Sequence, residues 1–64
     1  MKYKVLYDNE LVYNNNNRVV NVVTKDTIVD VKDIVDNRAI INDDYQEYYI
    51  NYRDNNNIVT LEKI

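Results

Sequence analysis

Two segments of the chain share one pattern, in which a cluster of asparagines separates two runs of β-forming residues. The first covers residues 11–24 around Asn14–Asn17, and the second covers residues 48–61 around Asn55–Asn57. The sequence has no Gly and no Pro, and Asn is the residue that, after Gly, most readily adopts a positive φ. We therefore expect each Asn cluster to be a turn, so that each segment forms a β-hairpin or two strands joined by a short loop.

The N-terminal residues 2–13 alternate between apolar and polar side chains. One side carries Tyr3, Val5, Tyr7, Leu11 and Tyr13, whereas the other side carries Lys2, Lys4, Asp8 and Glu10. A period of two is typical of a half-buried strand. The pair Asp8-Asn9 interrupts the pattern, so this segment is either one long strand with a bend or a tight hairpin that turns there.

Further strands are expected at residues 19–24, 45–53 and 58–63. In the segment 45–53, Tyr48, Ile50 and Tyr52 share one side, and Glu47, Tyr49, Asn51 and Arg53 share the other. Because the chain has no Phe and no Trp, tyrosines have to supply the aromatic part of the core. We expect Tyr48 and Tyr52 to be buried with Ile50, and Tyr49 to lie on the polar surface.

Residues 26–38 have a different period. Ile28, Val31 and Val35 are spaced at i, i+3 and i+7, while Asp26, Asp30, Asp33 and Asn37 occupy the opposite face of the corresponding helix. This spacing predicts an amphipathic helix. Intrinsic propensity favours a strand instead, because Val, Ile, Thr, Asp and Asn are poor helix formers. We favour the helix, since a regular strand would turn Asp33 to the same side as Val29 and Val31.

The element order is then ββαββ, in a single domain that spans residues 1–64. The simplest layered arrangement is a small α+β fold with a four-stranded, mostly antiparallel sheet and one helix across it. If the helix is absent, the alternative is an all-β, five-stranded small barrel. A chain of 64 residues buries only about 60% of its unfolded surface, so we expect a homodimer, with a tightly packed monomer as the alternative.

The composition rules out most catalytic and metal chemistry. The sequence contains no Cys and no His, which excludes zinc sites, Fe–S clusters, haem ligation, disulfides and the usual nucleophile–base pairs. The absence of Gly excludes phosphate-binding loops. Paired carboxylates remain, but Asp43 and Asp44 are adjacent and would point apart on a strand. We therefore expect no enzymatic activity, no cofactor and no metal.

Asp26, Asp30 and Asp33 form the first group of candidate site residues. On the predicted helix they would share one acidic face. Such a face either mimics the phosphates of nucleic acid, or holds a hard divalent cation, or is simply solvated. Solvation is the interpretation that we favour, because Lys25, Lys32 and Arg38 interrupt the acidic field.

The second group is the candidate protein-binding patch, which consists of Tyr45, Glu47, Tyr49 and Arg53. Tyr and Arg are enriched at the energetic centres of protein interfaces, where a rigid ring provides a large contact area at a small cost in entropy. The alternative is that the tyrosines serve only to build the core.

The leading functional hypothesis is a non-enzymatic, acidic, protein-binding module. The composition, rich in Asn and Tyr, is typical of an AT-rich genome, and a small modulator or inhibitor of a host protein, encoded by a phage or mobile element, fits it. No apolar run has the length of a transmembrane segment or signal sequence, so the cytoplasm is the default location. One alternative is a single-stranded nucleic-acid binder that uses exposed Tyr with Lys2, Lys4, Arg18 and Arg53. The net charge of -3 argues against this alternative, because nucleic-acid binding needs a basic surface. Another is a designed or reduced-alphabet protein without a natural partner.

Overall fold

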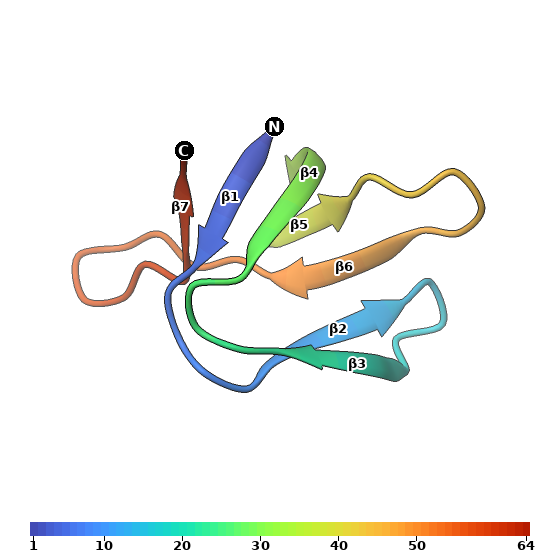
Figure 1. Ribbon diagram of the computed structural model, residues 1–64, viewed down its shortest axis with the longest axis horizontal. Helices are drawn as coiled ribbons and strands as arrows, with labels where there is room; N and C mark the ends of the chain where they lie inside the picture. Colours follow the sequence, from blue (N-terminus) through green and yellow to red (C-terminus); the bar gives the residue numbers. More distant parts are fainter.

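The computed structural model describes residues 1–64, and all of its regular structure is β (Figure 1). The seven strands are β1 (Lys2–Val5), β2 (Glu10–Asn14), β3 (Val19–Val23), β4 (Ile28–Val35), β5 (Arg38–Ile41), β6 (Tyr48–Asn51) and β7 (Leu61–Lys63). They form one sheet in the order β3-β2-β6-β5-β4-β1-β7, and every pairing is antiparallel. The predicted α+β fold with one helix is therefore wrong, whereas the all-β alternative agrees with the structure.

The first half of the chain is one long hairpin with a bend in its middle. Near its tip, the Asn14 N–H donates to the Arg18 carbonyl at 2.9 Å, and beyond the bend the Asp26 N–H donates to the Val5 carbonyl at 2.7 Å. The pairing thus runs from the β2–β3 end to the β1–β4 end.

Residues 2–13 form two strands, β1 and β2, joined through a turn at Asp8 and Asn9. The prediction of one common side is wrong, because Tyr3 and Val5 are core residues, whereas in β2 it is Val12, and not Leu11 or Tyr13, that lines the core side.

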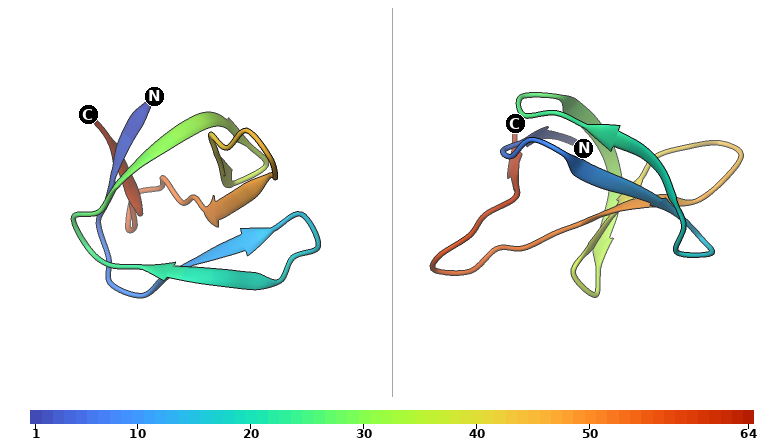
Figure 2. Two further views of the ribbon diagram at one scale, coloured as in Figure 1. Left: turned by 45° about the vertical axis from the view of Figure 1, so that its right-hand side comes forward. Right: turned by 90° about the horizontal axis from the view of Figure 1, so that it is seen from below.

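The second half of the chain closes the curled sheet. After β6, an isolated bridge joins Asp54 to Val59, and the Thr60 N–H donates to the Arg53 carbonyl at 3.0 Å. This second hairpin leads directly into β7, which pairs with β1. The strands consequently wrap around a shared interior, as both views in Figure 2 show.

A β-bulge interrupts the strand period of two within residues 26–38. Val31 faces Ile41 across the β4–β5 pair, but Asp33 faces Ile40, so Lys32 is one extra residue in β4. The extra residue reverses which side chains face inward. Val31 and Ile34 therefore both pack in the core, at a spacing of three residues.

The bulge also removes the objection to a strand. Beyond Lys32, Asp33 points away from the core side to which Val29 and Val31 belong. The other two residues of the predicted helical core are not core residues, because Ile28 is 49% exposed and Val35 is 46% exposed. The propensities of the segment, which favoured a strand, gave the right answer.

Asparagine and aspartate make all the turns that need a positive φ. The five residues with positive φ are Asn9, Asn17, Asp26, Asp36 and Asn37. Asp36 and Asn37, with φ of 51° and 62°, form the two-residue turn between β4 and β5, a conformation that favours Gly, Asn and Asp. Both predicted Asn clusters are turns, in which the side chains of Asn14 and Asn55 each accept two backbone N–H groups.

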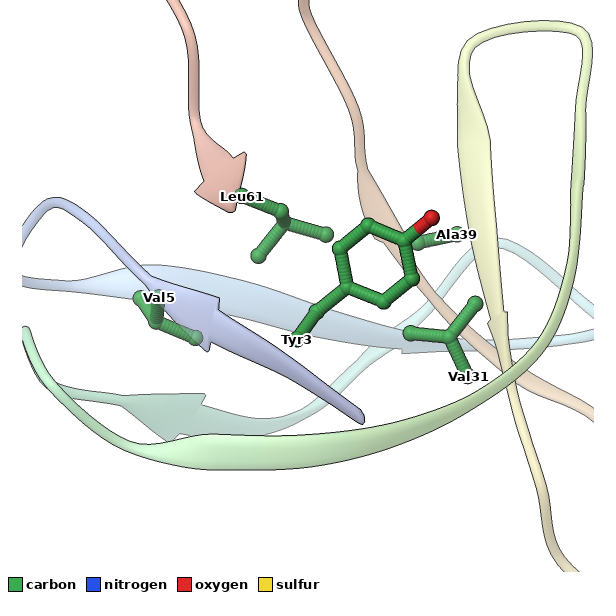
Figure 3. Packing of buried hydrophobic residues seen from close by; sticks show 5 residues of the cluster. All are labelled: Tyr3, Val5, Val31, Ala39 and Leu61. Carbon is green, nitrogen blue, oxygen red and sulfur yellow. The ribbon is translucent and has the colours of Figure 1, made fainter. Parts of the chain in front are cut away.

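The core is small and draws on strands from both halves of the chain. Tyr3, Val5, Val31, Ala39 and Leu61 converge from β1, β4, β5 and β7 (Figure 3). Ile50 of β6 is also fully buried. Because distant segments supply these side chains, the core forms only when β1, β4, β5 and β7 have come together in the sheet.

Alanine substitutions at Val31 and Val35 distinguish the bulged strand from a helix. We expect Val31→Ala to lower the free energy of unfolding by about 2 kcal/mol, because it leaves a cavity in the core. Val35→Ala should change it by less than about 0.5 kcal/mol, because this side chain is half exposed. Urea unfolding followed by circular dichroism measures both values, and equal losses at the two sites would contradict the bulge.

Candidate functional site

The β3 strand leaves one edge of the sheet open. It pairs only with β2, and Val19, Val20 and Val22 are 50%, 49% and 47% exposed. The strand contains no charged residue, although charges are the usual means by which proteins protect such an edge from pairing. The other edge strand, β7, has three residues, of which two are Glu62 and Lys63. Of the two edges, β3 is the one suited to accept a further strand.

A second bulge, in β3, places Val20 on the same side of the sheet as Asn21 and Val23. Val12 faces Asn21 and Tyr13 faces Val19, so Val20 is an extra residue in β3. Val22 lies opposite Leu11 on the outer face of the sheet. The backbone of the strand is protected at one point, where the Val22 N–H donates to Oδ1 of the preceding Asn21 at 2.8 Å.

An apolar groove of about 340 Å³ opens beside β3 on the core side of the sheet. It is lined by Val12, Val20, Asn21, Val23, Val29, Ile41, Tyr48 and Ile50. None of these side chains is charged, and the Asn21 amide and the Tyr48 hydroxyl are its only polar side-chain groups. The groove can therefore receive an apolar side chain from a strand that pairs along β3.

On the outer face of the sheet, Tyr49 is the centre of a polar–aromatic cluster. Its ring stacks on Tyr13 with 5.0 Å between the centroids, and the Arg38 guanidinium lies 4.4 Å above its centroid. Its hydroxyl donates to Oδ1 of Asn17 at 2.7 Å. The cluster fastens the β2–β3 turn to β5 and β6, so it has a structural role.

The four residues of the candidate protein-binding patch do not lie together. Tyr49 is 6% exposed, so the expectation that it lies on the open surface is wrong. Tyr45 is 94% exposed in the loop before β6. Glu47 is exposed in the same loop, whereas Arg53 follows the far end of β6. A binding role for Tyr45, Glu47 and Arg53 stays a prediction, but β6 separates the first two from the third.

The alternation of β6 correctly predicts which side chains share a face of the sheet, but it does not predict how far each is buried. Ile50 is fully buried, Tyr48 lines the groove with it, and Tyr52 packs against the core, so all three share the inner side as expected. Tyr48 and Tyr52 are nevertheless only half-buried, and they are more exposed than Tyr49 on the opposite side. Burial raises the pKa of the Tyr52 hydroxyl, which also donates to Asp54 at 3.2 Å.

The three aspartates of the predicted acidic face do not share a helix face. Asp26 occupies the turn before β4, with a φ of 73°. The carboxylate of Asp30, on β4, accepts from the Met1 amino group at 3.1 Å and lies 3.5 Å from Lys2 Nζ, and the first of these contacts contributes most to lowering its pKa. Asp33 accepts the backbone N–H of Ile34 at 2.8 Å. The three residues thus lie in separate local settings, and nowhere do three carboxylates converge as a metal site would require.

The basic residues considered for nucleic-acid binding are also dispersed. Lys2 and Lys4 lie on β1, Arg18 lies at the β2–β3 turn, and Arg53 lies beyond β6. Lys2 is paired with Asp30, and Arg53 acts electrostatically on Glu10. These side chains do not line a common groove along which a phosphate backbone could run.

Comparisons with protein-family models, with curated proteins and with solved structures give no match for this chain. The structure holds no helix of the length and apolarity needed to cross a membrane.

Substitutions of Tyr49 test its structural role. We expect Tyr49→Ala to lower the free energy of unfolding by about 3 kcal/mol, because a buried ring is lost. Tyr49→Phe should lower it by about 1 kcal/mol, because only the hydrogen bond to Asn17 is removed. The control is Tyr45→Ala, which should have an effect below about 0.5 kcal/mol. Urea unfolding measures all three, and a neutral Tyr49→Ala variant would show that the ring is dispensable.

Glu10, at the start of β2, has a raised pKa because burial disfavours its charged form, which Arg53 only partly offsets. The folded state thus favours the protonated carboxyl, and the stability that this provides is lost as the pH rises through the folded-state pKa. We expect Glu10→Gln to raise Tm by about 2 °C at pH 7. At pH 3 both side chains are neutral, so the difference should disappear. Thermal melts at the two pH values test this, with Asp44→Asn as the control in an exposed loop.

Proposed function

We propose that the protein is a non-enzymatic binding module that captures an extended polypeptide strand along β3. The observation that carries the proposal is the combination of an open, uncharged edge strand with an apolar groove directly beside it. Main-chain hydrogen bonds to an edge provide affinity, and a pocket for alternate side chains provides selectivity. A strand with a β-branched or aliphatic residue at every second position meets both requirements.

This mode of binding uses what the fold leaves exposed. Val22 and Leu11 provide an apolar rim on the outer face, and Val20 leads into the groove on the inner face. The side chains of a strand added along β3 would alternate between the two faces of the sheet, so they would contact Val22 on the outer face and Val20 on the inner face. The gain comes from the burial of apolar area, at about 25 cal/mol per Å². The composition, rich in Asn and Tyr, favours one biological setting: the protein would be a small modulator or inhibitor of a host protein, encoded by a phage or mobile element of an AT-rich genome.

The experiment is selection of displayed random peptides on the immobilised protein, followed by affinity measurement with the selected peptides. We expect enriched sequences to alternate apolar and polar residues, and to bind at least tenfold more weakly, about 1.4 kcal/mol, to Val20→Asp. The matched control is Val59→Asp, an exposed valine on the other hairpin, which should bind as the unmodified protein does. Selected peptides that bind Val20→Asp with undiminished affinity would refute β3 as the binding edge.

A further inference from the structure

We infer that the strand captured by β3 is β3 of a second copy of this chain, paired antiparallel about a two-fold axis through Val22. The inference rests on the proposed function, because it takes β3 to be the binding edge. The Val22 N–H donates to the adjacent Asn21 side chain, and successive residues of a strand direct their backbone groups to alternate sides. Val22 is thus a position at which β3 can bond to a new strand.

The faces of the sheet select Val22 as the centre. About this residue, Asn21 meets Val23 of the partner subunit, and both line the groove on the core side of their own chain. A centre at Asn21 would instead set Val20 against the partner's Val22. These two lie on opposite faces, because the bulge at Val20 shifts the register. Only the first arrangement joins like faces of the two sheets.

Apolar complementarity supports the same axis. Leu11 faces Val22 across the β2–β3 pair, and both side chains are exposed on the outer face. The two-fold axis sets Val22 beside Val22 of the partner subunit. The result is one continuous apolar row of four side chains, two from each copy, across the joined sheet. Cross-strand apolar neighbours of this kind are the unit of sheet stabilisation.

The charges at the ends of β3 do not oppose pairing with a second copy of the same strand. Arg18 precedes the strand, Lys25 and Asp26 follow it, and all three are exposed. The antiparallel pairing brings Arg18 of one copy toward Lys25 and Asp26 of the partner subunit, whose opposite charges offset each other. No charged residue occurs between Val19 and Val23 to oppose the pairing. A contact that matches a single patch with itself is typical of two-fold dimers.

Asn21 makes the association reversible. In the separate chain its Oδ1 accepts the Val22 N–H, so this edge donor is satisfied without a partner. Pairing exchanges that side-chain bond for one to a main-chain carbonyl, and the net gain in hydrogen bonding is small. Affinity therefore depends on the apolar row, and we expect a dimer that dissociates in the micromolar range.

Sedimentation equilibrium of the unmodified chain and two lysine variants is the primary test. We expect Val22→Lys to weaken self-association at least tenfold, because it places two like charges on the axis. Val35→Lys is the matched control, since Val35 is equally exposed, at 46% against 47%, but lies away from β3. Circular dichroism verifies that both variants are folded. Equal association of Val22→Lys and the unmodified chain would overturn the inference.

Cysteine cross-linking tests the register, since the chain has no Cys of its own. A self-paired residue on a hydrogen-bonded position brings its two Cα atoms to about 5.5 Å, within the range that a disulfide can span. We expect Val22→Cys to form a covalent dimer on oxidation with diamide, and Val35→Cys to stay monomeric at the same concentration. Equal cross-linking at both sites would overturn the two-fold register.

The two proposals fail in different ways. An unmodified chain that is monomeric at high micromolar concentration, yet binds displayed peptides along β3, overturns the second copy as occupant and leaves the proposed function standing. A monomer that selects no such peptides overturns both. A dimer that Val22→Lys does not weaken places the interface elsewhere and overturns the inference, whatever peptides are selected.

Discussion

Two single-residue bulges determine which side chains of this chain enter its core. The bulge at Lys32 allows Val31 and Ile34 to face inward together, and the bulge at Val20 turns this side chain to the core side with Val23. A sheet that curls around so small an interior needs places where the strand bends and its pairing shifts. The open edge at β3 follows from the terminal position of this strand in the sheet.

The sequence was informative where structure is local. The Asn clusters identified two turns, and the alternation from Lys2 to Tyr13 identified extended chain, because the conformation of Asn and the period of a strand depend on neighbouring residues alone. The alternation did not predict that the turn at Asp8 and Asn9 places Leu11 and Tyr13 on the outer face. The side assignments of Ile50 and Tyr49 were also correct. With Gly absent, Asn and Asp supply every positive φ, including the Asp36-Asn37 turn, which lies inside the predicted helix.

The errors arose where distant residues decide the outcome. A bulge is defined by its partner strand, so the strand could not be distinguished from a helix by the spacing of Ile28, Val31 and Val35 without knowing that Ile40 and Ile41 lie opposite. Tyr49 faces outward as expected, but Arg38 and Tyr13 cover it from neighbouring strands. One sequence feature does indicate the β3 edge. Valine occurs on both sides of the strand formed by residues 19–23, which leaves no fully polar side for solvent.

An apolar, open edge has a cost, because it invites uncontrolled association. The chain limits that cost with Asn21, whose side chain satisfies the Val22 N–H and is, with the Tyr48 hydroxyl, one of two polar side-chain groups in the groove. A valine at this position would pack no worse and would leave the edge unprotected. The core alone gives no reason for three half-exposed valines on one short strand, since they contribute little to its burial. The proposed pairing with a further strand would give these valines a role, and the Asn21 amide protects the Val22 N–H of the separate chain.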